Sequence, residues 1–145
     1  MNLSIYLVPP LQVSQWVPGL KKYLEKSEAW TRGRAEAVDI VEFLLTGRMY
    51  LWVVVDDVMK PWGYVITEIK DYPKCKMLVI QYCAGEDNHM KYIEDEMYHA
   101  LDNFAQDAGC AGIEFFGRPG WGRYAKKYGY EVKTVVFEKY FEVQP

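Results

Sequence analysis

The sequence predicts an α/β domain, more closely α+β, in which a mixed and mostly antiparallel sheet of about six strands carries helices on both faces. Short β-rich runs and helical periodicities follow one another in the order β-α-α-β-β-β-α-β-α-β. The 145 residues, half of them hydrophobic, are enough to bury one core. We therefore expect a single domain over residues 1–145.

The N-terminal part predicts one strand and two helices. Residues 3–8 alternate loosely and end at a Pro-Pro pair, which favours an edge strand because proline cannot donate to a ladder. Pro18 fits the first turn of a helix. A connection over residues 28–33 leads to a second helix over residues 35–45, which Gly47 ends.

Three β-rich runs follow. Residues 49–55 are a continuous apolar run, as expected for a strand buried on both faces. Residues 62–69 and 76–83 are rich in β-branched and aromatic residues, with turn residues between them. Together the three runs predict an antiparallel meander.

The C-terminal part begins with the clearest helix. Apolar residues recur at three- and four-residue steps from Met90 to Ala108, Asp87 or Asn88 can cap the start, and Gly109 ends the pattern. Such a helix is about 30 Å long.

A strand over residues 112–116 comes next, followed by a Gly- and Arg-rich turn over residues 117–123. A short helix over residues 124–128 and a final strand over residues 132–141 complete the predicted order.

This order, with its central meander, resembles the GNAT N-acyltransferase superfamily over nearly the full length. The element Gly-Arg-Pro-Gly-Trp-Gly-Arg at 117–123, followed by Gly129-Tyr130, is similar to a group of phage-encoded GNAT-like proteins with a Gly-Arg-x-Gly-Trp-x-Arg motif. The resemblance implies a viral or prophage origin and acetyl-CoA as acyl donor. It also implies a cleft where the fourth and fifth strands splay apart, here between about Tyr82 and Glu114.

In that superfamily, the pyrophosphate of coenzyme A binds backbone N–H groups at the start of the long helix, in a Gln/Arg-x-x-Gly-x-Gly/Ala loop. The resemblance implies these cofactor-binding residues here: Gln81, Tyr82, Cys83, Ala84, Gly85 and Asn88.

The spacing of this loop departs from the pattern, because Gln81 lies four residues before Gly85 and Asp87 takes the second small position. Glu86 and Asp87 would then face the pyrophosphate, and each like charge at about 4 Å costs roughly 1 to 4 kcal/mol. We expect weak or absent acetyl-CoA binding. The alternative is that Asp87 or Asn88 caps the helix and fills the anion site itself.

Amine acetylation needs a base for the ammonium proton and an acid for the thiolate. The resemblance implies a Tyr acid at a position that holds Ala125 here, so Tyr124 is the adjacent candidate and Tyr128 a second one. Glu68 and Glu114, on the third and fifth strands, are the candidate bases. For each of these residues the alternative is ordinary packing or a polar strand face.

Arg118 and Arg123 flank Trp121 in the Gly-rich turn. They could contact an anion or a partner, or stack a guanidinium on the indole. The alternative, equally weighted, is that Trp121 fills the core and the arginines pair with surface acids. We predict a mostly buried Trp121 against residues 101–108, with both arginines on the outer side.

Other ligand classes have little support. His89 and His99 lie about 15 Å apart along one helix and cannot share a metal, so no metal site is expected. Three cysteines without C-x-x-C spacing predict reduced thiols in a cytoplasm. A net charge of −3 does not favour binding to nucleic acid. No apolar stretch is long enough for a membrane span.

The sequence thus leaves two hypotheses nearly level. One is an acetyl-CoA-dependent N-acetyltransferase whose acceptor is a small-molecule or protein amine, in the cytoplasm of a bacterial host. The other is a non-catalytic GNAT-like phage or prophage protein, associated with the virion or with a host protein, that has lost cofactor binding. The oligomeric state stays open.

Overall fold

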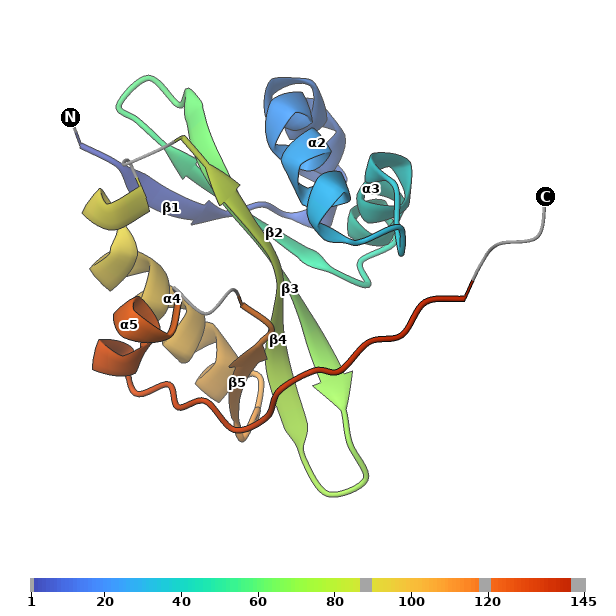
Figure 1. Ribbon diagram of the computed structural model, residues 1–145. Coiled ribbons are helices and arrows are strands. Elements are labelled where there is room, and N and C mark those ends of the chain that lie inside the picture. Colours follow the sequence, from blue (N-terminus) through green and yellow to red (C-terminus); the bar gives the residue numbers. More distant parts are fainter. Residues whose placement is uncertain (1, 87–89, 118–120, 142–145) are drawn as a thin grey trace.

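The computed structural model describes residues 2–86, 90–117 and 121–141. Its centre is an open sheet of five strands in the order β1-β2-β3-β4-β5 (Figure 1). The strands are β1 (Ser4–Leu7), β2 (Tyr50–Val55), β3 (Pro61–Asp71), β4 (Lys76–Gly85) and β5 (Gly112–Phe115). Strands β1 to β4 pair antiparallel, and β5 pairs parallel with β4. The predicted mixed, mostly antiparallel sheet is confirmed.

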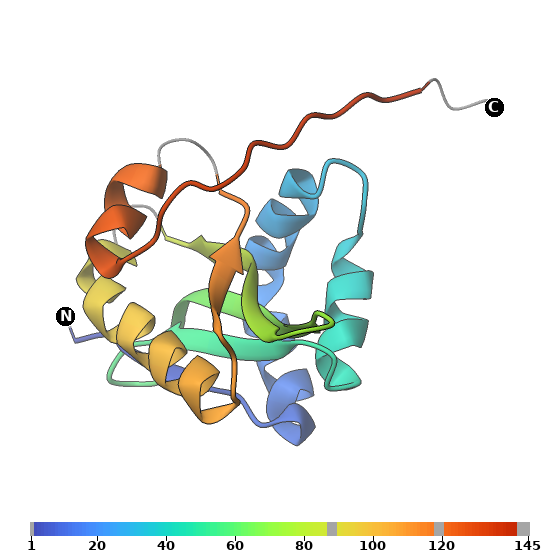
Figure 2. The same ribbon diagram turned by 90° about the horizontal axis from the view of Figure 1, so that it is seen from below.

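Helices cover both faces of the sheet (Figure 2). The α-helices are α1 (Val13–Trp16), α2 (Lys21–Trp30), α3 (Ala37–Leu45), α4 (Glu94–Asp107) and α5 (Trp121–Ala125). Short 3-10 turns are η1 (Pro10–Gln12), η2 (Val17–Leu20), η3 (Met90–Tyr92) and η4 (Lys126–Tyr128). Helices α2 and α3 lie on one face, and α4 and α5 lie on the other. No helix in the described part is long and apolar enough to span a membrane.

The strand period of two divides the buried side chains between two cores. On β2, Leu51 and Val53 pack under α2 and α3, whereas Trp52 packs under α4. Tyr64 of β3 joins the first core, and its hydroxyl donates a hydrogen bond of 3.0 Å to the backbone carbonyl of Tyr23 in α2. This bond holds α2 against β3. The continuous apolar run of β2 is explained by the helices on both faces of the sheet.

Helix α4 is shorter than its sequence pattern predicts. Its α-helical part starts at Glu94 after η3, has no side-chain cap at Ile93, and has 14 residues, about 21 Å in length. Ile93 is fully buried in a small core with Leu3 and Val54, and this anchor interrupts the helical geometry there. The predicted capping residues 87 and 88 lie outside the described residues.

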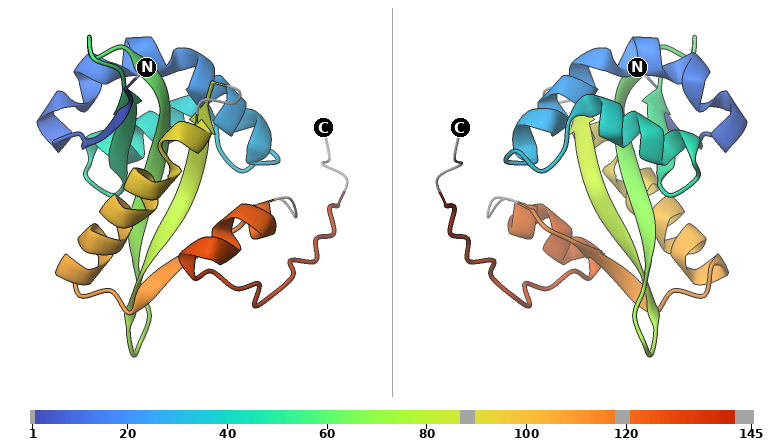
Figure 3. Two further views of the ribbon diagram at one scale, coloured as in Figure 1. Left: turned by 90° about the vertical axis from the view of Figure 1, so that its left-hand side faces the viewer. Right: turned by 90° about the vertical axis from the view of Figure 1, so that its right-hand side faces the viewer.

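The predicted final strand is wrong. Residues 130–141 form no helix or strand in the structure, although their composition favours a strand. The segment runs apart from the strands (Figure 3), and no strand of the described residues pairs with it. The helix before it starts at Trp121 rather than at Tyr124.

Candidate functional site

Strands β4 and β5 separate near the middle of β4. Their register runs from Met77 opposite Gly112 to Ile80 opposite Phe115, and β4 then continues to Gly85 without β5 beside it. Figure 3 shows β5 diverging from the rest of β4. The predicted splay is therefore confirmed, although it begins just beyond Glu114, which still pairs with Val79.

A β-bulge sits at the same place. Ile66 of β3 lies opposite Tyr82, but the next residue, Thr67, lies opposite Ile80, so Gln81 is an extra residue in β4. A bulge bends its strand and redirects the side chain of the extra residue. The separation of β5 and the bend of β4 thus coincide at Ile80 and Gln81.

The bulged residue, Gln81, is hydrogen-bonded to a second predicted site residue, Glu68. The side-chain amide of Gln81 donates a hydrogen bond to Oε2 of Glu68, and the distance is 3.0 Å. Arg48 Nε donates to the other carboxylate oxygen at 3.1 Å. Sequence analysis did not find Arg48, because it lies 20 residues from Glu68 along the chain and no local pattern links them.

Glu114 lies on the same sheet face as Glu68. Val79 of β4 is opposite Glu68 on one side and Glu114 on the other, so the two glutamates are two strand spacings apart, about 10 Å between Cα atoms. The hydroxyl of Tyr72 donates to Glu114 Oε1 at 2.5 Å, and this bond raises the pKa of Tyr72. Each carboxylate therefore has its own partner, and sequence analysis missed Tyr72.

No protein family model matches the sequence, and no curated protein matches it. Solved structures do resemble it. Glucosamine-6-phosphate N-acetyltransferase from Arabidopsis thaliana is 14% identical, with a TM-score of 0.71 over 98% of this chain and 100% of that chain. An aminoglycoside acetyltransferase from an uncultured soil metagenomic sample, in complex with sisomicin, is 13% identical, with a TM-score of 0.72 over 98% and 97%.

A third structure, a predicted acetyltransferase from Clostridium acetobutylicum with acetyl-CoA, is 16% identical, with a TM-score of 0.67 over 96% of both chains. The three superpose on this protein over nearly the full length of its chain. The chain has the GNAT fold. Identities this low show the fold alone, so the chemistry has to be argued from the residues.

The predicted acid of the GNAT cleft has no contact with either carboxylate. Tyr124 lies on α5 with 54% of its surface exposed, and no hydrogen bond joins it to Glu68 or Glu114 in the described part of the chain. Tyr128 is held elsewhere: its ring stacks on Tyr98 with centroids 4.1 Å apart, and its hydroxyl donates to Asp95. Tyr128 thus packs η4 against α4.

Most of the predicted cofactor-binding residues at 82–85 have side chains that pack into the protein. Tyr82 and Ala84 pack toward α2 and α3, and Cys83 points into the α4 core. Burial raises the pKa of Cys83 to about 12, so its thiol stays protonated and is a poor nucleophile. The carbonyl of Gly85 accepts a hydrogen bond of 3.3 Å from Lys26. Asn88 lies outside the described residues.

Glu86, which the sequence predicts to face a pyrophosphate, has partners that the sequence did not reveal. Its carboxylate forms an ion pair with Lys22 and accepts a 2.9 Å hydrogen bond from the Tyr23 hydroxyl, both on α2. These partners lower the pKa of Glu86. Lys22 therefore offsets the negative charge from which the sequence predicts repulsion, and that repulsion stays a prediction.

Acidic residues instead occupy the first turn of α4. Glu94, Asp95 and Glu96 all lie there, where the helix dipole would attract an anion. Lys127 pairs with Glu94 at 3.3 Å and the Tyr128 hydroxyl with Asp95. A pyrophosphate near this turn would meet carboxylates already placed at the positive end of the helix.

Trp121 is mostly buried, as the sequence predicts, but its ring neighbour differs from the predicted one. The ring packs edge-on against Phe115 of β5, with centroids 6.2 Å apart, and Trp121 is not part of the core that contains Leu101 and Ala105. Because α5 already begins at Trp121, the indole lies beside Phe115, the last residue of β5. Arg123 is exposed. Arg118 lies outside the described residues.

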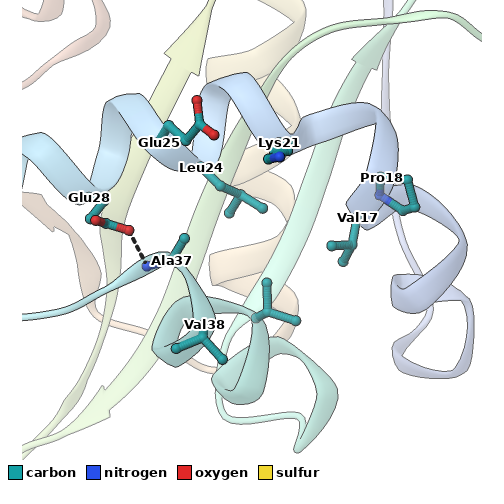
Figure 4. Close-up of a pocket in the computed structure, with 9 residues that line it drawn as sticks. Val17, Pro18, Lys21, Leu24, Glu25, Glu28, Ala37 and Val38 are labelled. Atoms are coloured by element: carbon teal, nitrogen blue, oxygen red, sulfur yellow. Dashed lines mark hydrogen bonds between the residues drawn. The ribbon is translucent and has the colours of Figure 1, made fainter.

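A groove of about 430 Å³ lies between η2, α2 and α3 (Figure 4). None of the predicted site residues lines it. Its floor includes Val17, Leu24 and Val41, and Glu28 closes one end by accepting a 2.7 Å hydrogen bond from the backbone N–H of Ala37. Among the described residues, no group of three or more His, Cys, Asp or Glu side chains could hold a metal ion.

Proposed function

We propose that the protein is an N-acetyltransferase that moves an acetyl group from acetyl-CoA to an amine. The observation that supports this most strongly is the coincidence of the Gln81 bulge with the last β4–β5 pair, Ile80 and Phe115. The coincidence leaves one edge of residues 81–85 without a strand partner in the described part of the chain. Tyr82, Cys83 and Ala84 contribute that edge.

The pantetheine arm of acetyl-CoA fits this site better than its pyrophosphate does. Its pantetheine arm carries two amide groups, which can pair with the free edge of β4 as an added strand would. Its pyrophosphate would meet the acidic first turn of α4, while Lys22 is already paired with Glu86. The arm therefore fits and the pyrophosphate fits poorly, which supports weak binding.

Glu68 is the base that we favour. When bound, acetyl-CoA supplies an activated thioester carbonyl, and the acceptor must reach it as a neutral amine. Glu68 can take the ammonium proton, because Arg48 and Gln81 each hold one of its oxygens and fix its orientation. Glu114 is the second candidate. Tyr124, with its exposed phenol, is the candidate acid that returns a proton to the leaving thiolate.

A non-catalytic role is the second candidate function. Three carboxylates in the first turn of α4 favour it, since they stand where a GNAT enzyme would meet the anionic part of its donor. The protein would then be a phage or prophage factor, in the host cytoplasm or associated with the virion, that uses the fold as a binding surface. For the enzyme, the acceptor that we propose is an amine of a small molecule or a protein.

Isothermal titration calorimetry with acetyl-CoA, followed by a thiol-release assay with a panel of amines, tests the two candidates. Weak binding with amine-dependent release supports the enzyme, and no heat at any concentration supports the non-catalytic role. A variant with Glu94, Asp95 and Glu96 changed to Gln, Asn and Gln should bind acetyl-CoA more tightly. Asp102→Asn with Asp107→Asn, far along the same helix, is the matched control and should leave the affinity unchanged.

A further inference from the structure

Strand β5 is the last strand of the sheet and is paired on one side only. Its single neighbour is β4, and no other described segment pairs with its outer edge. An open edge presents a row of backbone N–H and C=O groups that can accept another strand. The free edge of β5 is therefore a place where the sheet can grow.

Residues 132–141 have the composition of a strand but lack a partner. The segment is rich in β-branched and aromatic residues. Its large apolar side chains are exposed, with Phe137 at 92%. They are Val132, Val135, Val136, Phe137, Tyr140 and Phe141. A monomeric protein rarely exposes so much contiguous apolar surface, so this segment needs to be covered.

The two ends of the segment contact different parts of its own chain, and no pairing with β5 joins them in the described residues. At its start, Tyr130 packs against Phe115 and Tyr98, with ring centroids 5.3 Å and 5.6 Å apart. Near its end, Glu138 forms ion pairs with Arg32 and Arg34, at 2.5 Å and 3.3 Å, in the connection between α2 and α3. Figure 3 shows the segment after α5 running apart from the strands of the sheet.

We propose that residues 132–141 of one copy pair with the free edge of β5 in a second copy, and that the exchange is reciprocal. Each copy supplies one segment and one edge, so a two-fold dimer satisfies both at once and closes without free ends. The sixth strand that the sequence predicts would then be completed between chains. This proposal goes beyond the enzymatic one and does not depend on it.

Size-exclusion chromatography with light scattering on the full chain, over a wide range of concentrations, tests the proposal first. The expected mass is twice the 17.0 kDa of one chain. A mass of one chain at every concentration overturns the proposal, because the segment would then stay uncovered or fold back on its own β5.

Phe137→Asp tests whether the segment makes the dimer. Phe137 is exposed within its own chain, so the change leaves the monomer folded, and circular dichroism checks this. We expect the mass to fall by half. Leu11→Asp is the matched control, since Leu11 is 95% exposed in η1, and it should remain dimeric. A dimer that survives Phe137→Asp overturns the proposal.

Hydrogen exchange identifies the partner of the segment. Backbone amides of β5 and of residues 132–141 should both be protected in the wild-type dimer, and both should lose protection in Phe137→Asp. Protection of the segment without a change at β5 overturns the proposal, because it means that two segments pair with each other.

Discussion

Gln81 donates a hydrogen bond from its side-chain amide to Oε2 of Glu68 across β3 and β4, over 3.0 Å. Gln81 is also the extra residue of the bulge, and the residue before it, Ile80, is the last one of β4 that pairs with β5. The bend of β4, the loss of β5 and the orientation of the Glu68 carboxylate therefore depend on one another. Arg48 completes the arrangement from the start of β2.

Glu68→Gln should lower kcat for amine acetylation by about 10² to 10⁴, the usual contribution of a positioned general base. The melting temperature should change little, because the substituted amide keeps the shape of the side chain. Turnover at saturating acetyl-CoA and amine is the measurement. Glu114→Gln is the comparison: a larger loss there would move the base to β5, and full activity in both variants would exclude both carboxylates.

Thr67→Val should destabilise the protein by about 1 to 3 kcal/mol. Trp52 Nε1 donates to Thr67 Oγ1 at 3.0 Å, and both side chains are buried, so the isosteric valine leaves the indole N–H without an acceptor. Urea unfolding measures the change. Repeating the substitution in a Trp52→Phe background is the control, and the same loss there would show that the hydrogen bond is not its cause.

The stability that Glu86 contributes should depend on pH. Lys22 and Tyr23 hold the pKa of Glu86 below its ordinary value of 4.5. A lowered pKa in the folded state stabilises the protein fully above about pH 4.5, and this stabilisation is lost as the pH falls through the folded-state pKa.

Urea midpoints of the wild type and Glu86→Gln across this pH range test that statement. The wild type should be more stable at neutral pH, and the difference should shrink on acidification. Lys21→Gln is the control, because Lys21 lies on the same helix α2 and forms no ion pair with Glu86 in the described part of the chain. A difference that grows toward low pH would have the wrong sign and would rule out the ion pair as its source.

Sequence periodicity was enough to predict the elements whose partners adjoin them in the chain. The meander of β2, β3 and β4 follows from three β-rich runs with short turns, and burial on both faces of β2 follows from its unbroken apolar run. The parting of β4 and β5 came from the resemblance to the superfamily, and the structure moved its start only slightly.

Contacts between distant parts of the chain left no local signal. Glu86 was predicted to repel an anion, but its partner Lys22 lies 64 residues earlier. The composition of residues 132–141 predicts a strand, yet a strand also needs a neighbour, and the described chain supplies none beside them. Composition therefore predicted the tendency of that segment but not its pairing.

The partial exposure of Trp121 changes what its removal should cost. A fully buried tryptophan replaced by alanine costs about 3 to 5 kcal/mol. Here the indole is partly exposed and packs edge-on against Phe115, its aromatic contact among the described residues, so we expect roughly 1 to 2 kcal/mol for Trp121→Ala.

Trp121→Phe is the matched variant, because it keeps a ring against Phe115, and it should recover most of that loss. Urea unfolding of the two variants gives both values. A loss of 3 kcal/mol or more for Trp121→Ala, with no recovery in Trp121→Phe, would mean that the indole is buried in a core. Loss of a partner or ligand without loss of stability would instead place Trp121 on a binding surface, beside the end of β5, where the sheet is open.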